Sequence, residues 1–293
     1  MPENSITRRN VYDVITSRIL AALEKGTVPW HRPWTTHPPS NLLTKKPYRG
    51  VNVLVLRCNT FTSSWWVTYR QVELLGGHVC KGERGSPVCF WKWIERAEDE
   101  DAEGQPDSSK PSVPLLRYYP VFNVEQCRGI SRHLPPPRSV EVEPIPAAEA
   151  IVAGMPSPPR IQHRTLQAAY HPSLDLVTVP ALEDFEDPEA YYSTLLHELA
   201  HSTGHSSRLN RPTVTDAYPF GSTNYSKEEL TAEMAAAFLC GHAGISNRTV
   251  DNSAAYLQGW MERLSEDRRL LIHAASAAQK AADYILGQLS PSP

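Results

Sequence analysis

Hydrophobic positions recur at the spacing of a helix close to the start of the chain. Over residues 7–25 they form a single stripe, which predicts an amphipathic helix that buries Val11, Ile15, Ile19, Ala22 and Leu23. Thr7 is suited to cap the start of this helix and Gly26 to end it. The segment TVPWHRPWTTHPPSN (27–41) follows, and its prolines exclude regular structure.

The next hydrophobic runs predict a mixture of short helices and strands. VNVLVL (51–56) fits either a strand or a buried helix, and YRQVELLGG (69–77) fits a short helix that ends at glycine. HVCKGERGSPVCFWKWI (78–94) predicts a β-hairpin with ERGS as its turn. Residues 95–114 are acidic and rich in proline and serine, which is typical of a mobile surface insertion, and a strand resumes at 114–127.

A proline-rich spacer at 133–146 separates this small α+β domain, residues 1–132, from a second domain at 147–293. The second domain is expected to be mainly helical, with helices at 147–155, 188–204 and 226–244 and a helical tail of two segments over 252–288. Pro188 suits the first turn of its helix. Residues 165–180 predict two strands joined by the turn HPSLD, and thus a short β-sheet.

Charge is divided unevenly between the two halves. Residues 1–94 carry 13 Lys and Arg against 5 Asp and Glu, whereas residues 133–293 carry 11 against 19. Six of the seven tryptophans also lie before residue 94. A basic, aromatic-rich front half favours a polyanionic partner with groups that stack, and the acidic rear half is not expected to bind it.

Cysteines and hydropathy indicate a cytoplasmic protein with no membrane partner. The five cysteines are odd in number and form no C-x-x-C pair, so we expect reduced thiols, with a Cys80–Cys89 bridge as the weaker alternative. The first residues have no uninterrupted apolar core of a signal peptide, and no apolar run is long enough to cross a bilayer.

The stretch LLHELAHSTGH (195–205) contains H-E-x-x-H, the pattern of helical zinc peptidases. His197 and His201 are four residues apart and therefore share one helix face, from which both imidazoles can reach one Zn²⁺; another divalent ion such as Mn²⁺ is the alternative. Glu198 is the expected catalytic base. The competing interpretation is a surface helix with two histidines and an ordinary glutamate, but the surrounding apolar residues favour an interior-facing site.

Two residues compete as the third metal ligand, because catalytic zinc usually takes three protein ligands and water. On a straight helix the three histidines would span about 12 Å, so His205 can bind only if the chain turns back at Gly204. Glu229 on the next predicted helix is favoured, with Glu233 accepting the N–H of a ligand histidine. The alternative is that Glu229 completes a capping box with Ser226. The donor that stabilises the oxyanion stays open among His205, Tyr225 and Arg208.

The front half interleaves aromatic and cationic side chains. This pattern favours single-stranded DNA with little sequence preference, because bases stack on aromatic rings and cations neutralise phosphates. The alternative is that the tryptophans are core and the cations ordinary surface. The candidate nucleic-acid-binding residues are Trp30, Arg32, Trp34, Lys45, Lys46, Tyr48, Arg49, Trp65, Tyr69, Arg70 and Lys81.

Taken together, the two halves resemble the ArdC-type antirestriction proteins of conjugative plasmids. The resemblance rests on TVPWHRPW, PSN, YRGVN, LDLVTVP, HELAHSTGHSSRL and YSKEELTAEM, and it covers nearly the whole chain. It implies a single-stranded-DNA-binding domain followed by a zincin-like metallopeptidase domain, with protection of incoming plasmid DNA from host restriction. It also implies that His197, His201 and Glu229 hold the metal and that Glu198 is catalytic.

Three functions compete at this stage. The first is a DNA-tethered metallopeptidase, and the second is a DNA-binding shield whose metal site is structural or vestigial. The third is a peptidase whose basic half recognises an acidic protein. Glu198 favours an active site, because a structural metal site does not need a base.

Overall fold

The computed structural model describes most of the chain. The described residues are 10–25, 28–29, 38–59, 61, 63–95, 112–135, 144–163, 168–185, 187–216, 223–245 and 254–288.

The described front half combines helices with two small sheets. The helices are α1 (Val11–Leu23), α2 (Val51–Arg57) and α3 (Tyr69–Leu74). A four-stranded sheet of order β1-β2-β5-β4 contains β1 (Ser40–Asn41), β2 (Trp65–Val67), β4 (Ser86–Glu95) and β5 (Ser112–Asn123). A separate pair joins β3 (His78–Val79) to β6 (Cys127–Arg128). β1 and β2 are parallel, and the other pairs are antiparallel.

The hairpin predicted at 78–94 is wrong. β4 pairs with β5 along ten register positions, from Ser86↔Val121 to Glu95↔Ser112, while β3 pairs with β6. The long apolar strand β4 finds an equally long partner only across the segment 96–111, which lies outside the described residues. The two-residue strand β3 is too short to replace β5 as the pairing partner of β4. The turn-like residues ERGS therefore connect two different sheets.

Two further details of the front half are settled by the structure. VNVLVL forms the helix α2 rather than a strand, and its Val and Leu side chains are buried all round, as in a core helix. The cap of α1 is Asn10, whose side chain accepts a hydrogen bond from the Tyr12 N–H at 3.2 Å. The helix therefore begins later than predicted, and the cap expected at Thr7 lies outside the described residues.

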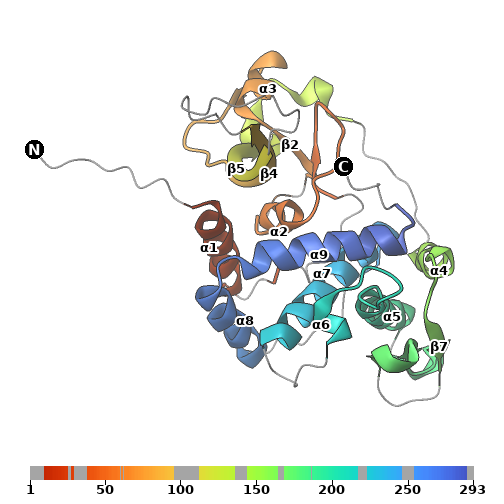
Figure 1. Cartoon of the computed structure of the whole chain (residues 1–293). Coiled ribbons are helices and arrows are strands. Elements are labelled where there is room, and N and C mark those ends of the chain that lie inside the picture. Colours follow the sequence, from red (N-terminus) through yellow and green to blue (C-terminus); the bar gives the residue numbers. More distant parts are fainter. Residues whose placement is uncertain are drawn as a thin grey trace, which may run out of the picture.

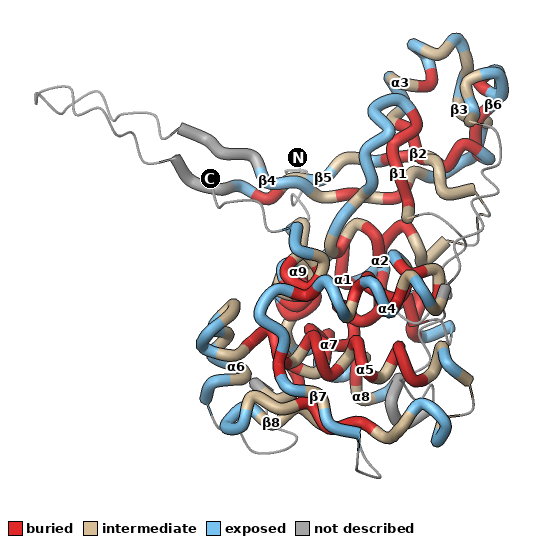
Figure 2. Tube along the Cα trace, turned by 90° about the vertical axis from the view of Figure 1, so that its right-hand side faces the viewer, coloured by how far each residue is buried: buried red, intermediate tan, exposed pale blue. Residues whose placement is uncertain are grey.

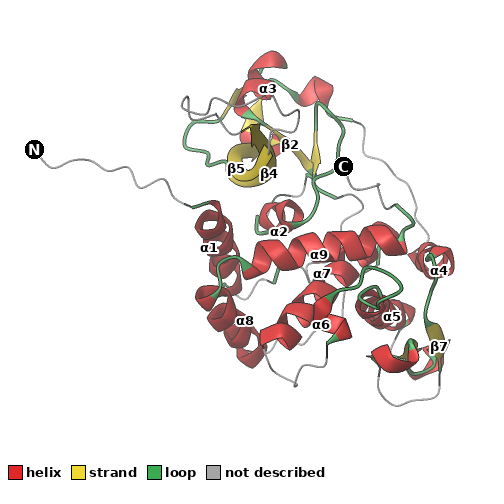
Figure 3. Ribbon diagram, in the orientation of Figure 1, coloured by secondary structure: helices red, strands yellow, loops and turns green. Residues whose placement is uncertain are grey.

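The rear half is mainly helical with a short β-sheet, as the sequence predicts. Its helices are α4 (Pro144–Gly154), α5 (Pro188–Ser202), α6 (Pro212–Thr215), α7 (Thr223–Ala243), α8 (Ala254–Glu266) and α9 (Leu270–Ile285). The sheet has the order β7-β9-β8, with β7 (Arg160–Gln162), β8 (Ala169–His171) and β9 (Leu176–Thr178). The strands β8 and β9 are antiparallel and flank the predicted turn. Because β9 is the middle strand of this sheet, β8 is an outer strand. The helices gather in one layer below the long strands β4 and β5 (Figure 3).

One hydrophobic core joins the two halves. Ile15 of α1 and Val53 of α2 belong to the same buried cluster as Leu196 of α5 and Ala278 of α9. Helix α9 lies between α2 and α7 (Figure 1), and the buried segments form a continuous band through these helices (Figure 2). The limits 1–132, 133–146 and 147–293 stay a prediction, and residues 136–143 of the spacer lie outside the described residues.

Polar contacts reinforce this junction. The guanidinium of Arg49, just before α2, forms an ion pair with Asp283 of α9. The Gly50 N–H donates to Gln279 Oε1 at 2.9 Å, and Gln279 in turn donates to Asp283 at 3.0 Å. The loop that precedes α2 is thus fastened to α9. Among the described helices, none is long and apolar enough to cross a membrane.

Candidate metal centre

Helix α5 is fixed in place by its cap and by its apolar face. The Asp187 side chain accepts a hydrogen bond from the Ala190 N–H at 2.9 Å, and Pro188 occupies the first turn. Leu195, Leu196 and Leu199 are fully or almost fully buried in the shared core. Burying these residues turns the opposite positions of the same helix toward α7, which packs against α5.

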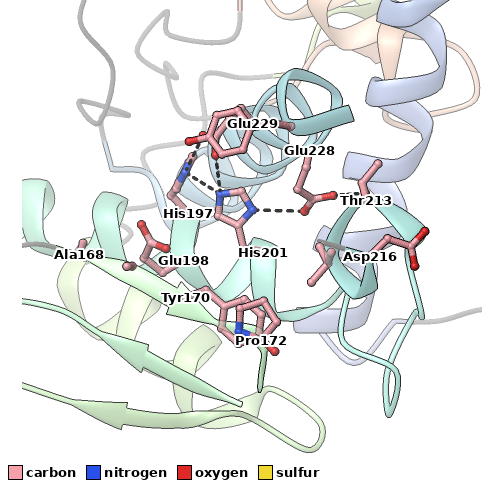
Figure 4. A pocket seen from close by; sticks show the side chains of 13 residues that line it. Ala168, Tyr170, Pro172, His197, Glu198, His201, Thr213, Asp216, Glu228 and Glu229 are labelled. Atoms are coloured by element: carbon pink, nitrogen blue, oxygen red, sulfur yellow. Dashed lines mark hydrogen bonds and ion pairs between the residues drawn. The ribbon is translucent and has the colours of Figure 1, made fainter. Parts of the chain in front are cut away.

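The side chains of His197, His201 and Glu229 converge between α5 and α7 (Figure 4). The two Nε2 atoms are 3.1 Å apart. One Glu229 oxygen lies 3.7 Å from His197 Nε2, and the other lies 3.5 Å from His201 Nε2. Donor atoms held about 2.1 Å from a tetrahedral zinc ion would be separated by about 3.4 Å. The spacing of the three donors therefore fits a divalent ion.

The ring electrostatics also suit a cation. Burial lowers the pKa of His197 to about 3, with the neighbouring His201 adding to the effect. Burial also disfavours the charged form of His201, but its bond to Glu228 and the charge of Glu229 outweigh this and raise its pKa to about 9. His201 Nε2 therefore carries a proton that faces His197 Nε2. An ion bound by both rings would displace it, as metal binding to histidines generally requires.

Glu228, not Glu233, is the carboxylate that orients a ligand histidine. Glu228 Oε1 lies 3.2 Å from His201 Nδ1. His197 Nδ1 is buried with no partner among the described residues, so neither ring places its second nitrogen on Glu233. Glu233 is buried one helical turn beyond Glu229, about 6 Å along the axis of α7. The contact predicted for Glu233 is made to His201 by Glu228, and the role of Glu233 stays a prediction.

The capping-box alternative for Glu229 is also excluded. α7 begins at Thr223, so Ser226 lies inside the helix and cannot be its cap. The adjacent acid in the sequence, Glu228, was the residue that the pattern failed to single out. The sequence did contain a signal for this role, because adjacent glutamates on a buried helix must point in different directions. Glu229 points to the two Nε2 atoms, and Glu228 points to Nδ1 of His201.

Arg211 holds Glu228 in its charged form. Arg211 Nη2 lies 2.5 Å from Glu228 Oε1 and its Nε lies 3.1 Å from Oε2, while Thr213 Oγ1 donates to Oε2 at 2.5 Å. Burial disfavours ionisation of Glu228, but the hydrogen bonds from His201 and Arg211 outweigh it and lower its pKa to about 2. Arg211 also donates to the Ala200 carbonyl at 3.0 Å near the end of α5. A single guanidinium thus ties together both helices of the site.

Glu198 faces the cavity from beside the histidines (Figure 4). Burial raises the pKa of its carboxyl group, and a hydrogen bond from the Tyr170 N–H of β8 partly opposes this. The cavity has a volume of about 530 Å³ and is lined on one side by β8 and its neighbour Ala168, and on the other by α6. An extended substrate lying along the outer strand β8 would pass both Glu198 and the three donors.

The three side chains considered as oxyanion donors lie in different places. His205 does not join the metal site: its Nδ1 lies 2.8 Å from Ser207 Oγ. The side chain of Arg208 is 1% exposed and forms an ion pair with Asp175, which links the loop after α5 to the β8–β9 turn. Tyr225 lines the cavity and hydrogen-bonds to Glu229; burial, then the charge of Glu229, raises its pKa to about 12. Tyr225 is therefore the best placed of the three.

The candidate DNA-binding residues differ in where they lie and how exposed they are. Lys45, Lys46, Tyr69, Arg70 and Lys81 are exposed. Trp65 is half-buried, with the Lys45 ammonium 4.8 Å from the centre of its ring. Tyr48 and Arg49 lie instead at the junction with α9. Trp30, Arg32 and Trp34 lie outside the described residues.

Both halves match known families. Residues 146–277 match a zincin-like metallopeptidase model, and residues 9–122 match the N-terminal domain of the anti-restriction factor ArdC. The metal-free crystal structure of the antirestriction protein ArdC from plasmid R388 has a TM-score of 0.76 and 34% identity, covering 96% of this chain and 98% of that one. This chain belongs to the ArdC antirestriction family. A Mn(II)-bound structure of the R388 ArdC protein has a TM-score of 0.74 and 34% identity over the same shares of both chains.

Two proteins with related sequences show that the same unit occurs in chains of different length. The uncharacterized protein y4eC of Sinorhizobium fredii is 36% identical over 97% of this chain and 94% of its own length. The DNA primase TraC of Escherichia coli is 35% identical over 97% of this chain, but the match spans only 20% of the primase. The ArdC-like unit therefore also occurs within a much larger protein.

Gly204, just after α5, gives a test of how tightly α5 packs against α6 and Arg211. A Cβ at Gly204 would lie 2.4 Å from Val214 Cγ2 and 3.1 Å from Arg211 Cζ. Gly204→Ala should therefore displace α6 and the guanidinium, destabilise the fold by about 1–3 kcal/mol, and weaken metal binding about 10- to 100-fold. Thermal unfolding and a zinc titration measure the two effects.

Gly154→Ala is the matched control for this substitution. A Cβ at Gly154 meets nothing within 4 Å, and alanine in a helix is favoured over glycine by about 0.5–1 kcal/mol. This variant should be neutral or slightly stabilised with unchanged zinc affinity. Equal behaviour of the two variants would contradict the packing argument.

Proposed function

We propose that this protein is a cytoplasmic, single-stranded-DNA-binding antirestriction protein that protects incoming conjugative plasmid DNA, and that its rear half carries a zinc peptidase centre. The observation that carries the peptidase half is the placement of Glu198 beside three donors spaced for a metal ion, within a cavity bordered by an outer β-strand. The front half contributes exposed cations and aromatic rings, and a net positive charge over residues 1–94.

His197, His201 and Glu229 would hold the ion. A bound Zn²⁺ supplies a water of lowered pKa and polarises a carbonyl oxygen. Two imidazoles and one carboxylate suit zinc, and Mn²⁺ is the alternative that the same ligands accept. Glu228 fixes the orientation of the His201 ring through Nδ1, which leaves Nε2 directed at the ion.

The remaining chemistry falls to this chain's own residues. Glu198, with its pKa raised by burial, is suited to take a proton from the attacking water and to deliver it to a leaving amine. The backbone of β8 would bind an extended peptide by strand addition. The Tyr225 hydroxyl, at the cavity wall, would donate to the developing oxyanion.

DNA binding is proposed for the half-buried Trp65 and for the exposed residues Lys45, Lys46, Tyr69, Arg70 and Lys81. Arg49 contributes less, because Asp283 already engages its guanidinium. Single strands are favoured over duplex, since only unpaired bases offer their faces to aromatic side chains. Little sequence preference is expected, since stacking accepts any base.

The test measures affinity of the whole chain for single-stranded and duplex oligonucleotides by fluorescence anisotropy at several salt concentrations. The whole chain is needed because α1 and α2 share their core with the rear half. We expect tighter binding to single strands, and Lys46→Ala with Arg70→Ala should reduce the slope of log affinity against log salt by about 1.4. Lys280→Ala, an exposed lysine of α9, is the control. Equal affinity for duplex and single strand would contradict the proposal.

A further inference from the structure

Large apolar side chains are exposed together on the strands β4 and β5. Phe90, Trp91, Leu115 and Tyr118 are each 37–51% exposed. Isolated apolar residues are common on protein surfaces, but a cluster of this kind marks an interaction site. None of these four residues belongs to the DNA-contacting set discussed above.

The strand register arranges the aromatic rings as one diagonal pair on each face. Trp91 lies opposite Leu116, and Tyr118 lies opposite Cys89, so Trp91 and Tyr118 share one face. Phe90 and Tyr119 share the other face, with ring centres 5.5 Å apart. Side chains alternate between the faces of a strand, so neither pair can shield the other.

This part of the sheet is a two-stranded ribbon that exposes Trp91 and Tyr118 on one face and Phe90 on the other, while Leu116 and Val88 anchor the two faces in the core. β2 pairs with β5 only at Phe122 and Asn123, so β4 and β5 continue beyond it with each other alone. The ribbon leaves the body of the molecule above the helices (Figure 2). A ribbon of two strands is marginal by itself, and a partner that covers its rings would stabilise it.

The outer edge of β4 is closed to strand addition at Cys89, next to Phe90. The Asn52 side chain donates to the Cys89 carbonyl at 2.8 Å and accepts from the Cys89 N–H at 2.7 Å. A peptide strand could not use these groups. The ribbon therefore offers side-chain faces rather than a free edge, which disfavours a partner that binds by β-augmentation.

The charge nearby fits a nucleic acid. Arg117 lies directly opposite Phe90 and on the same face, where a guanidinium can meet a phosphate while the ring stacks on a base. The acidic residues of the insertion begin only at Glu95, beyond the ring pairs. Residues 1–94, which include all of β4 except Glu95, carry a net positive charge. Strand-borne aromatics with a basic neighbour are a common way to bind unpaired bases.

We propose that the aromatic rings on the two faces of the β4–β5 ribbon, Phe90 with Tyr119 and Trp91 with Tyr118, stack on bases of single-stranded DNA, with Arg117 on a phosphate. The inference rests on the proposed DNA binding and extends its surface to residues outside the basic segments. The strand would follow the ribbon after leaving the surface around Trp65 and Tyr69, because β2 and β5 belong to one sheet.

The test separates stacking from simple apolar contact. Trp91 and Tyr118 are both changed to Leu in one variant of the whole chain, and both to Phe in another. We expect the Leu variant to bind a single-stranded 30-mer about 25-fold or more weakly, at about 5-fold or more per ring, and the Phe variant to stay within about threefold of the parent. Arg117→Gln should reduce the salt slope by about 0.7. Leu182→Ala, an exposed apolar residue of the rear half, is the control.

Each result is decisive. Failure of the parent to bind any oligonucleotide removes the proposed DNA binding, and this inference with it. If the parent binds and the Leu variant binds equally well, the ribbon is not a DNA surface, although the proposed function stands. A Leu variant that keeps its DNA affinity but changes from dimer to monomer in light scattering assigns the ribbon to self-association and overturns the inference. Unchanged thermal unfolding of the variants establishes that the fold is intact.

Discussion

Replacing Glu229 with alanine should reduce the affinity of the protein for Zn²⁺ by more than about 100-fold, which exceeds the usual effect of losing a residue that only supports a ligand. Glu229 supplies the one carboxylate whose two oxygens lie 3.5 and 3.7 Å from the ligand nitrogens. Without it the two histidines hold an ion by two bonds only. Competition against a chromogenic chelator measures the affinity, and elemental analysis of the purified protein gives the bound metal.

His205→Ala is the control, because His205 lies four residues beyond His201 and contacts Ser207 instead of the site. It should retain about one ion per chain. The reverse outcome, with metal lost from His205→Ala and kept by Glu229→Ala, would mean that the chain turns back at Gly204 in solution and that the ligand set is wrong.

Glu198→Gln should remove hydrolysis and leave metal, fold and DNA binding in place. Glu198 lies beside the donors without being one of them, and glutamine keeps its shape but cannot accept a proton. General-base catalysis contributes about 10²- to 10⁴-fold, so peptide cleavage should fall by that factor. Cleavage of a mixed peptide library followed by mass spectrometry, with zinc content measured on the same samples, checks the prediction.

The same variant tests the means by which the proposed protection of DNA would work. We expect plasmid transfer into a restricting host to remain protected by Glu198→Gln, because a protein that coats the strand needs only its DNA contacts. Loss of protection by a stable variant that still binds DNA would show that proteolysis is the means of protection. Equal peptide cleavage by parent and variant would remove Glu198 from the catalytic role.

Local sequence patterns predicted the metal-binding side chains better than the side chains that hydrogen-bond to them. H-E-x-x-H on an apolar helix placed His197 and His201 on one face because helical periodicity fixes it. Glu229 followed from ligand number, and the structure brings it to both rings. Glu228 was missed because the start of α7 was placed at Ser226, where an adjacent glutamate looks like part of a cap.

Long-range pairing was the main failure. The residues ERGS satisfy the local chemistry of a turn, and nothing within 78–94 reveals that β4 instead pairs with a strand beyond a long insertion. The shared core of the two halves was likewise not predicted from the sequence. The stripe of α1 and the run VNVLVL showed that these segments are buried, but a hydrophobic pattern does not say against which element.

Helix α9 makes stability a property that the two halves share. One side of α9 packs against α7, which carries Glu228 and Glu229, and the loop before α2 is fastened to it through Arg49 and Gln279. Unfolding the front half would expose the apolar face of α9 that packs against α2, so we expect the two halves to lose their structure together. Ion binding to the native state alone then stabilises the entire chain, by about 2.7 kcal/mol at a hundredfold excess over the dissociation constant. The front half, for which DNA binding is proposed, would therefore owe part of its thermal stability to an ion bound in the rear half, and removal of the metal would lower the unfolding temperature of the whole protein.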